Sequence, residues 1–182
     1  MKNYILILLL FISLTLFSQN IDIINPVKEI GLKNWRMVND NVMGGISNST
    51  MYINQKQNLI FSGEVSLDNN GGFASCRLGI EKVNLNGIES FKMRVKGDGK
   101  TYKFRLSERY GSTNYSSNFK TKNGTWLNIE IPLKNLKPMF MGYYSRSLPK
   151  LEIKNIRSIG FQISDKQEGK FNLEIMLVQA VY

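Results

Sequence analysis

Two segments rich in Asn, Asp and Gly hold the residues best suited to form a ligand site. The first runs Trp35-Arg-Met-Val-Asn-Asp-Asn-Val-Met-Gly-Gly-Ile-Ser47, and the second runs Asn69-Asn-Gly-Gly-Phe-Ala-Ser-Cys76. Glycine adopts positive φ and lets the backbone approach closely, so the pairs Gly44-Gly45 and Gly71-Gly72 predict two special turns. The apolar pair Val42-Met43 predicts that the first turn packs against the core.

Asp40 has two possible roles in the first segment. Its carboxylate can accept backbone N–H bonds and lock the turn that the glycines require, which is the commoner use of such a residue. It can also orient a sugar hydroxyl, or bind Ca²⁺ together with oxygen ligands from Asn39, Asn41, Asp68 and Asn70. We favour the structural role and assign no metal.

Aromatic side chains offer flat apolar faces on which sugar rings stack, and the candidates are Trp35, Trp126, Tyr143 and Tyr144. Trp126 faces opposite to Leu127 along an alternating segment, so we expect it to be partly exposed. For each tryptophan, capping the edge of the core is the favoured interpretation. The two tyrosines lie in residues 139–148, which lack clean alternation and which we expect to form a long surface loop.

Arg105 lies on the polar face of the alternating segment Tyr102-Lys-Phe-Arg-Leu106. Its guanidinium can bind an anion, or it can pair with a cross-strand carboxylate such as Glu64 or Glu130. We favour the ion pair.

The residue inventory argues against an enzyme. The sequence has no histidine, which excludes Ser-His-Asp and Cys-His catalysis and His-ligated metal sites. The single cysteine, Cys76, alternates in phase with apolar neighbours and is expected in the core. The glycine pairs lack a phosphate-binding context, and the spacing of Asp40 and Glu108 does not support a catalytic pair. We therefore predict a non-enzymatic protein without a cofactor.

Alternation with a period of two dominates the rest of the chain. Apolar residues recur at every second position in 59–67, 91–95, 102–106, 127–131, 159–163 and 171–177, and turn-forming clusters separate these segments. Only 132–138, bracketed by prolines, looks like a short helical turn. Strands at this spacing without alternating helices predict an all-β sandwich or jelly roll.

The N-terminus reads as a targeting segment. Lys2 precedes an almost wholly apolar run from Tyr4 to Phe17, which is shorter than the ~20 residues of a membrane span. We expect residues 1–18 to be a signal peptide, 19–33 a lead-in and 34–182 one domain, exported and without a transmembrane span after cleavage. An uncleaved anchor is the alternative.

The chain has 182 residues and a net charge of +10. Its basic residues are scattered, and no run of five like charges occurs, so a solvated basic surface is the favoured interpretation. The excess can also attract anionic glycans, lipid headgroups or acidic proteins. Nucleic acid is a poor partner for an exported chain.

The order of several motifs resembles one known family, the complex I intermediate-associated protein 30 (CIA30) family. The motifs that carry the resemblance are Trp35, Asn39-Asp40, Val42-Met-Gly-Gly45, Ser47, Phe61-Ser-Gly63, Asn70-Gly-Gly-Phe-Ala-Ser75, Val95-Lys-Gly-Asp-Gly99, Tyr102–Leu106, Trp126, Ile156–Gly160 and Ser164–Ile175. The resemblance implies a galactose-binding-like jelly-roll β-sandwich. It also implies a role similar to that of the mitochondrial members, which are non-enzymatic assembly factors for respiratory complex I.

Two classes of function stay open. The family resemblance implies a protein-binding or chaperone-like module, although the expected export points away from complex I assembly. The fold and the export favour a carbohydrate-binding module, an argument by analogy of fold alone. The partner is thus expected to be an unidentified protein or a glycan.

Overall fold

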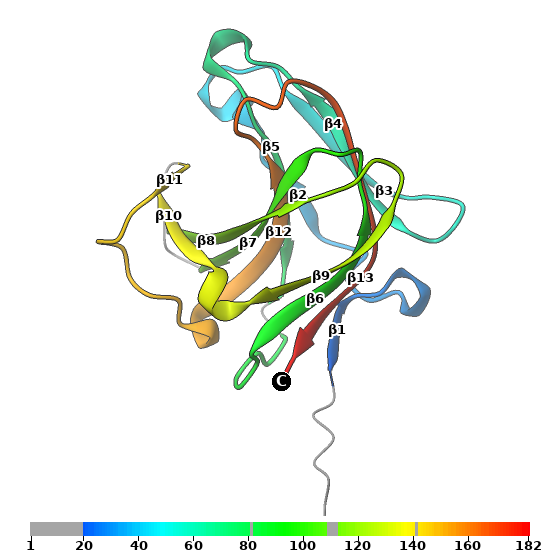
Figure 1. Cartoon of the computed structure of the whole chain (residues 1–182), viewed down its shortest axis with the longest axis vertical. Coiled ribbons are helices and arrows are strands. Elements are labelled where there is room, and N and C mark those ends of the chain that lie inside the picture. Colours follow the sequence, from blue (N-terminus) through cyan, green and yellow to red (C-terminus); the bar gives the residue numbers. More distant parts are fainter. Residues whose placement is uncertain (1–19, 81, 109–112, 141) are drawn as a thin grey trace, which may run out of the picture.

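Apolar faces of alternating strands meet in a β-sandwich of two antiparallel sheets, as seen in the computed structural model, which describes residues 20–80, 82–108, 113–140 and 142–182 (Figure 1). This confirms the predicted all-β, galactose-binding-like jelly roll. The signal-peptide prediction for residues 1–18 lies outside the described residues.

Among the described residues, the first sheet has six strands. Five of them pair in the order β3 (Asn48–Ile53), β4 (Leu59–Val65), β13 (Gly169–Val181), β6 (Ser90–Lys96) and β9 (Trp126–Pro132). The sixth, β1 (Ile21–Ile24), pairs with β13. The segment 19–33, expected to be a lead-in, thus supplies a strand. Its register is irregular between Asp22 and Ile24, and Ile23 and Ile24 both belong to the core.

In the described part of the chain, the second sheet has seven strands, in the order β11 (Tyr143–Tyr144), β10 (Lys137–Phe140), β8 (Asn114–Lys120), β7 (Thr101–Glu108), β12 (Ile156–Ile163), β5 (Ala74–Gly79) and β2 (Trp35–Met37). The edge of this sheet differs from the expectation that residues 139–148 form a long surface loop. Part of the presumed loop 139–148 forms the hairpin β10–β11, at the left of Figure 1, because β10 finds free backbone groups on β8.

The helices among the described residues are short 3₁₀ turns, namely η1 (Pro26–Lys28), η2 (Asp40–Met43), η3 (Asp68–Asn70), η4 (Leu133–Asn135) and η5 (Ile153–Asn155). The turn η4 lies where the prolines predicted one. In the described part of the chain, no helix has the length and apolarity needed to cross a membrane.

Aromatic residues from both sheets fill the core. Phe91 of β6 meets Phe104 of β7 with ring centroids 5.0 Å apart, and Phe104 packs edge-on against Phe161 of β12. Such pairs each contribute about 0.5–1.5 kcal/mol beyond area burial. Cys76 on β5 is 1% exposed, as expected from its phase, and burial raises the pKa of its thiol. This side chain is a packing residue.

Candidate functional site

Asp40 is the centre of a hydrogen-bonded cluster that joins the two glycine segments. It is 1% exposed. Its Oδ1 accepts the Ser47 N–H at 2.9 Å, and its Oδ2 accepts the N–H groups of Gly72 at 2.7 Å and Phe73 at 3.2 Å, as well as the Ser47 hydroxyl. Burial alone raises the pKa of Asp40, but these hydrogen bonds outweigh it and hold the pKa below its ordinary value. The carboxylate is therefore ionised and fully partnered.

The glycines make room for this carboxylate. A Cβ at Gly45 would overlap the Asp40 carboxyl group, and a Cβ at Gly71 would lie 2.7 Å from Asp40 Oδ2. Positive φ falls on the other member of each pair, at 91° for Gly44 and 131° for Gly72. One glycine of each pair thus serves a close approach and the other a left-handed turn.

Asn39 extends the same cluster. Its Oδ1 accepts the Ser49 hydroxyl at 2.7 Å and the Ser75 N–H at 3.2 Å. The Asn39-Asp40 dipeptide therefore fastens η2 to both sheets. Asn39 Oδ1 and the oxygens of the Asp40 carboxylate accept hydrogen bonds from protein donors, which is the arrangement that the structural role requires.

The expectation that Val42-Met43 packs against the core is wrong. Val42 is 69% exposed and Met43 is 72% exposed, beside Ile46 at 56%. η2 is a single turn at the surface, and Asp40 is its one buried residue, while Asn41, Val42 and Met43 are exposed to solvent. Val42, Met43 and Ile46 form an exposed apolar patch at the first glycine segment.

The outer face of the seven-stranded sheet, turned away from the core, carries a row of basic side chains. Direct cross-strand partners share a face of a sheet. Arg36 pairs with Arg77, Arg77 with Gly160, Gly160 with Arg105, Arg105 with Ser116, and Ser116 with Lys137. We call Arg36, Arg77, Arg105 and Lys137 the basic row. It crosses six strands along one line of the register.

The basic row runs between two hollows of that face. The first, of about 280 Å³, is lined by Arg105, Lys103, Gln162, Tyr143 and the Gly71–Phe73 turn, among others. We call it the Tyr143 hollow. The second, of about 670 Å³, is lined by Arg36, Arg77, Lys82, Arg157 and Glu108, among others, and we call it the Arg36 hollow. The sheet is recessed here, since Lys103 and Ser116 are less than a tenth exposed although they point outward.

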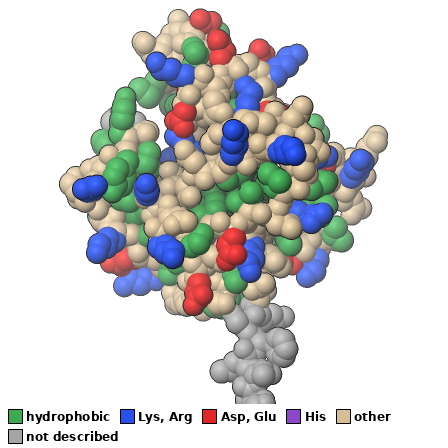
Figure 2. Space-filling model, in the orientation of Figure 1, with side chains coloured by type: hydrophobic (Ala, Val, Ile, Leu, Met, Phe, Trp, Pro, Cys, Tyr) green, Lys and Arg blue, Asp and Glu red, His purple; other side chains and the backbone are tan. Residues whose placement is uncertain are grey.

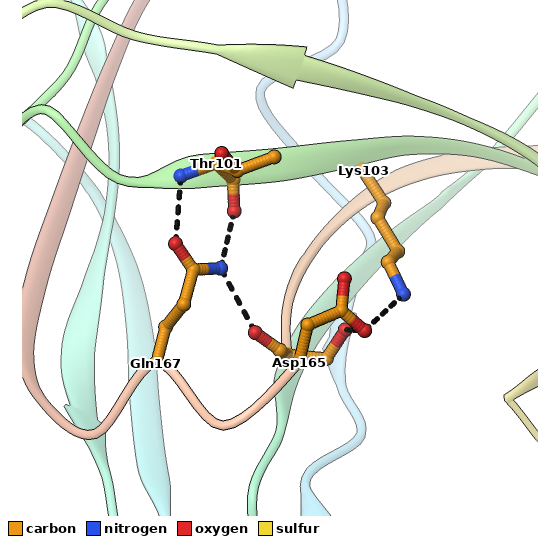
Figure 3. Close-up of polar contacts among 5 residues, drawn as sticks. Thr101, Lys103, Asp165 and Gln167 are labelled. Carbon is orange, nitrogen blue, oxygen red and sulfur yellow. Dashed lines mark hydrogen bonds and ion pairs between the residues drawn. The ribbon is translucent and has the colours of Figure 1, made fainter.

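The loop between β12 and β13 borders the Tyr143 hollow and is tied to β7 (Figure 3). The Gln167 amide accepts the Thr101 N–H at 2.8 Å and donates to the Thr101 carbonyl at 2.7 Å and the Ser164 carbonyl at 2.8 Å. Lys103 Nζ pairs with Asp165 Oδ1 at 2.7 Å. The Asp165 carboxylate is thus committed to Lys103.

The arginines of the basic row have no such partner. Among the described residues, no carboxylate lies within ion-pair distance of Arg36, Arg77 or Arg105; the pairs found involve other residues. Burial lowers the pKa of Arg77, and neighbouring Arg36 lowers it further. Burial, followed by the repulsion from Arg77, lowers the pKa of Arg105 to about 10. Both side chains remain cationic at neutral pH.

The prediction that Arg105 pairs with Glu64 or Glu130 is wrong. Those carboxylates lie on β4 and β9 in the other sheet, whereas Arg105 has β12 and β8 as its neighbours. Alternation indicated the correct face of the strand, but strand order decides which side chains share that face.

The structure brings four predicted residues, Gly71, Gly72, Arg105 and Tyr143, into the Tyr143 hollow. Tyr144 lies in a different hollow, with Lys137 over its ring at 5.7 Å. Trp126 is partly exposed on the six-stranded sheet, with Lys96 over its ring at 5.0 Å. Trp35 packs against the core and donates its indole N–H to the Gly31 carbonyl at 2.9 Å. The aromatic candidates therefore do not form one platform.

Sequence reasoning missed Arg36, Arg77, Lys103 and Gln162. Lysine and arginine side chains are spread over the face in Figure 2, which fits the predicted scatter of charge. The available signal was local: Arg77 alternates with the buried Cys76 and Leu78, so it had to point outward. What it faces depends on the neighbouring strands.

Comparison with known proteins gives one family and one fold. A family model described as complex I intermediate-associated protein 30 (CIA30) matches residues 25–175. No curated protein matches the chain in sequence.

The similar solved structures include carbohydrate-binding modules. The family 11 module of the cellulosomal cellulase Lic26A-Cel5E of Clostridium thermocellum has a TM-score of 0.68 at 14% identity, covering 91% of this chain and 96% of that one. A family 11 module from Clostridium thermocellum in complex with a beta-1,3-1,4-mixed-linked tetrasaccharide has a TM-score of 0.61 at 17% identity, with coverages of 82% and 90%. The agarase AgWH50C has a TM-score of 0.59 at 8% identity, covering 90% of this chain and 24% of that one. At these identities the likeness concerns the fold.

Proposed function

This chain belongs to the complex I intermediate-associated protein 30 (CIA30) family, and on that premise we propose that it is a non-catalytic domain that binds carbohydrate in the Tyr143 hollow. The observation that carries the proposal is the set of residues that line the same recess as Tyr143. The Tyr143 side chain is 79% exposed, and it lines one recess with Arg105, Lys103 and Gln162.

That combination suits a sugar. A pyranose offers C–H groups that stack on an aromatic face and hydroxyls that need hydrogen-bond partners. Tyr143 supplies the ring, and the guanidinium, ammonium and amide groups of the recessed sheet supply the polar contacts. The carbohydrate-binding modules among the similar structures support this choice at the level of fold only.

We also propose that the Tyr143 hollow does not catalyse glycoside hydrolysis. Glycoside hydrolysis usually needs two carboxyl groups flanking the bond. Among the described residues that line the Tyr143 hollow, Asp165 is the one carboxylate, and it is paired with Lys103. A lone, neutralised carboxylate suits binding better than hydrolysis.

The test is a comparison of two tyrosine variants on a glycan panel. Tyr143→Ala should weaken binding of the selected glycan about tenfold or more, because it removes the stacking ring. Tyr52→Ala is the matched control, since Tyr52 is 50% exposed on β3 of the other sheet. Isothermal titration calorimetry gives both affinities. Equal losses in the two variants, or no glycan binding by the wild type, would overturn the proposal.

A second candidate function is protein binding, and the exposed apolar patch of Val42, Met43 and Ile46 favours it. Solvent-exposed apolar residues that cluster in one motif are typical of docking surfaces. Replacing Met43 by Ser should then abolish a cross-linked complex that the wild type forms in envelope extract. The same variant should keep its glycan affinity, so the two functions are separable.

We also propose that the protein is exported. The basic start and the short apolar run at residues 2–17 support this. Intact-mass measurement of the protein from its native cell should find residues 1 to about 18 removed. A retained N-terminus in the cytoplasmic fraction would contradict export.

A further inference from the structure

We propose that the ligand of this face is an acidic polysaccharide, one that carries carboxylate or sulfate groups, and that Arg77 and Arg105 bind those groups. This inference rests on the proposed carbohydrate-binding function and adds the chemical class of the sugar. It starts from the row of like charges on the seven-stranded sheet.

The arginines of the basic row are aligned across neighbouring strands. Arg36 stands directly opposite Arg77, and Arg77 and Arg105 lie on either side of Gly160. Strands lie about 4.8 Å apart, so Arg77 and Arg105 start from backbone positions roughly 10 Å apart. Like charges directly opposite each other destabilise a sheet. Folding alone gives no reason to align them.

Among the described residues, no carboxylate pairs with Arg77 or Arg105. The two carboxylates that line the hollows have other partners: Asp165 pairs with Lys103, and Glu108 accepts the Tyr115 hydroxyl at 3.2 Å. Arg157 donates to the carbonyls of Lys154 and Ile156. Within the described residues, Arg77 and Arg105 therefore keep their guanidinium donors for a ligand, and guanidinium groups match carboxylate and sulfate-like oxygens well.

Gly160 on β12 separates the two arginines. A side chain at position 160 would overlap the Cys76 carbonyl, so only glycine fits there. The glycine leaves the outer face open between Arg77 and Arg105. Arg77 lines the Arg36 hollow and Arg105 lines the Tyr143 hollow, so Gly160 lies between one residue of each recess. An extended polysaccharide with repeated acidic groups suits this arrangement, because it can contact both arginines.

The polar lining favours a sugar chain over an acidic peptide. Around the row lie the hydroxyls of Ser116 and Ser158 and the amide of Gln162, with the exposed Tyr143 ring at one end. Hydroxyl and amide groups pair with sugar hydroxyls, and the ring stacks on a sugar face. A peptide chosen for its charge alone would use only the arginines.

The experiment measures the affinity of the full chain for four polymers by isothermal titration calorimetry. They are polygalacturonate for uronates, chondroitin sulfate for sulfated chains, a neutral mixed-linkage β-glucan, and poly-L-glutamate as a non-sugar polyanion. We expect one or both acidic glycans to bind more tightly than the other two, with an affinity that falls as salt is raised. The first two arms separate carboxylate from sulfate recognition.

Variants then assign the site. Arg77→Gln and Arg105→Gln should each weaken binding of the acidic glycan about ten- to a hundredfold, the loss expected for one charge-assisted contact. Arg94→Gln is the matched control: it removes the same charge from β6 in the other sheet and should leave the affinity within about twofold. Circular dichroism melts show that all three variants are folded.

The experiment distinguishes failure of the acidic-ligand inference from failure of the proposed carbohydrate-binding function. One outcome overturns the acidic ligand and leaves the proposed function standing. In it, the wild type binds the neutral glucan more tightly than both acidic glycans, Arg77→Gln and Arg105→Gln keep the wild-type affinity, and Tyr143→Ala binds more weakly. Binding of poly-L-glutamate as tight as that of the acidic glycans overturns sugar recognition in favour of an acidic protein partner. No binding of any glycan overturns both.

Discussion

Asp40, which is buried, and Arg77 and Arg105 of the basic row, which are partly buried, are ionised groups of the same domain, but their surroundings differ. Asp40 accepts four hydrogen bonds, from Ser47, Gly72 and Phe73. Arg77 and Arg105 face like charge and have no carboxylate partner among the described residues. A buried charge with all its partners holds a fold together, whereas one without them is available to a ligand.

The largest effect that tests this difference is the loss of the Asp40 carboxylate. Asp40→Ala leaves the N–H groups of Ser47, Gly72 and Phe73 without their acceptor, which should lower the free energy of unfolding by about 3 kcal/mol. Urea unfolding measures the change. Asp68→Ala is the control, because its side chain is exposed on the neighbouring turn η3. If Asp40→Ala melts like the control, the cluster is not structural.

The next effect separates the two glycines of the first pair. Gly45→Ala should cost about 1–3 kcal/mol, because its Cβ would overlap the Asp40 carboxyl group. Gly44→Ala should cost about 1 kcal/mol, because this residue has a φ of 91° but open space around it. In the background of Asp40→Ala, the penalty at Gly45 should shrink and the penalty at Gly44 should not. Double-mutant cycles read out that coupling.

The pH dependence of stability gives a third test. The folded pKa of Asp40 lies below its ordinary value, so the carboxylate adds stability above the unfolded pKa of about 3.9. That stability is lost as the pH falls through the folded pKa. Asp40→Asn lacks the contribution of the ionised carboxylate, so the free energy of unfolding of the wild type should exceed that of this variant by about 1–3 kcal/mol at pH 7. The gap should narrow below about pH 4, and a gap independent of pH would contradict this account.

The smallest effect concerns the arginines. Arg77→Gln and Arg105→Gln relieve repulsion between like charges, so without ligand each should keep the wild-type stability or raise it, by at most about 1 kcal/mol. Their thermal melts, run at low salt where the repulsion is strongest, check this. Early melting of either variant would mean that the arginine supports the fold, and the contrast with Asp40 would disappear.

Several features followed from the sequence alone. Alternation predicted strands at the positions of β4, β6, β7, β9, β12 and β13, because a half-buried strand must repeat with a period of two. The glycine pairs and the Asn39-Asp40 dipeptide predicted constrained turns, since the chemistry of an Asx residue and of glycine is local. Motif order identified the family, which the family model confirms.

Tertiary structure decided the rest. Arg36, Arg77 and Arg105 are far apart in sequence and meet because β2, β5, β12 and β7 are neighbours in that order. The same strand order places Glu64 and Glu130 in the other sheet, out of reach of Arg105. Local periodicity tells which way a side chain points from its strand, but not what stands beside it. Charge clusters and hollows depend on neighbours that are distant in sequence, and long-range pairing alone sets those neighbours.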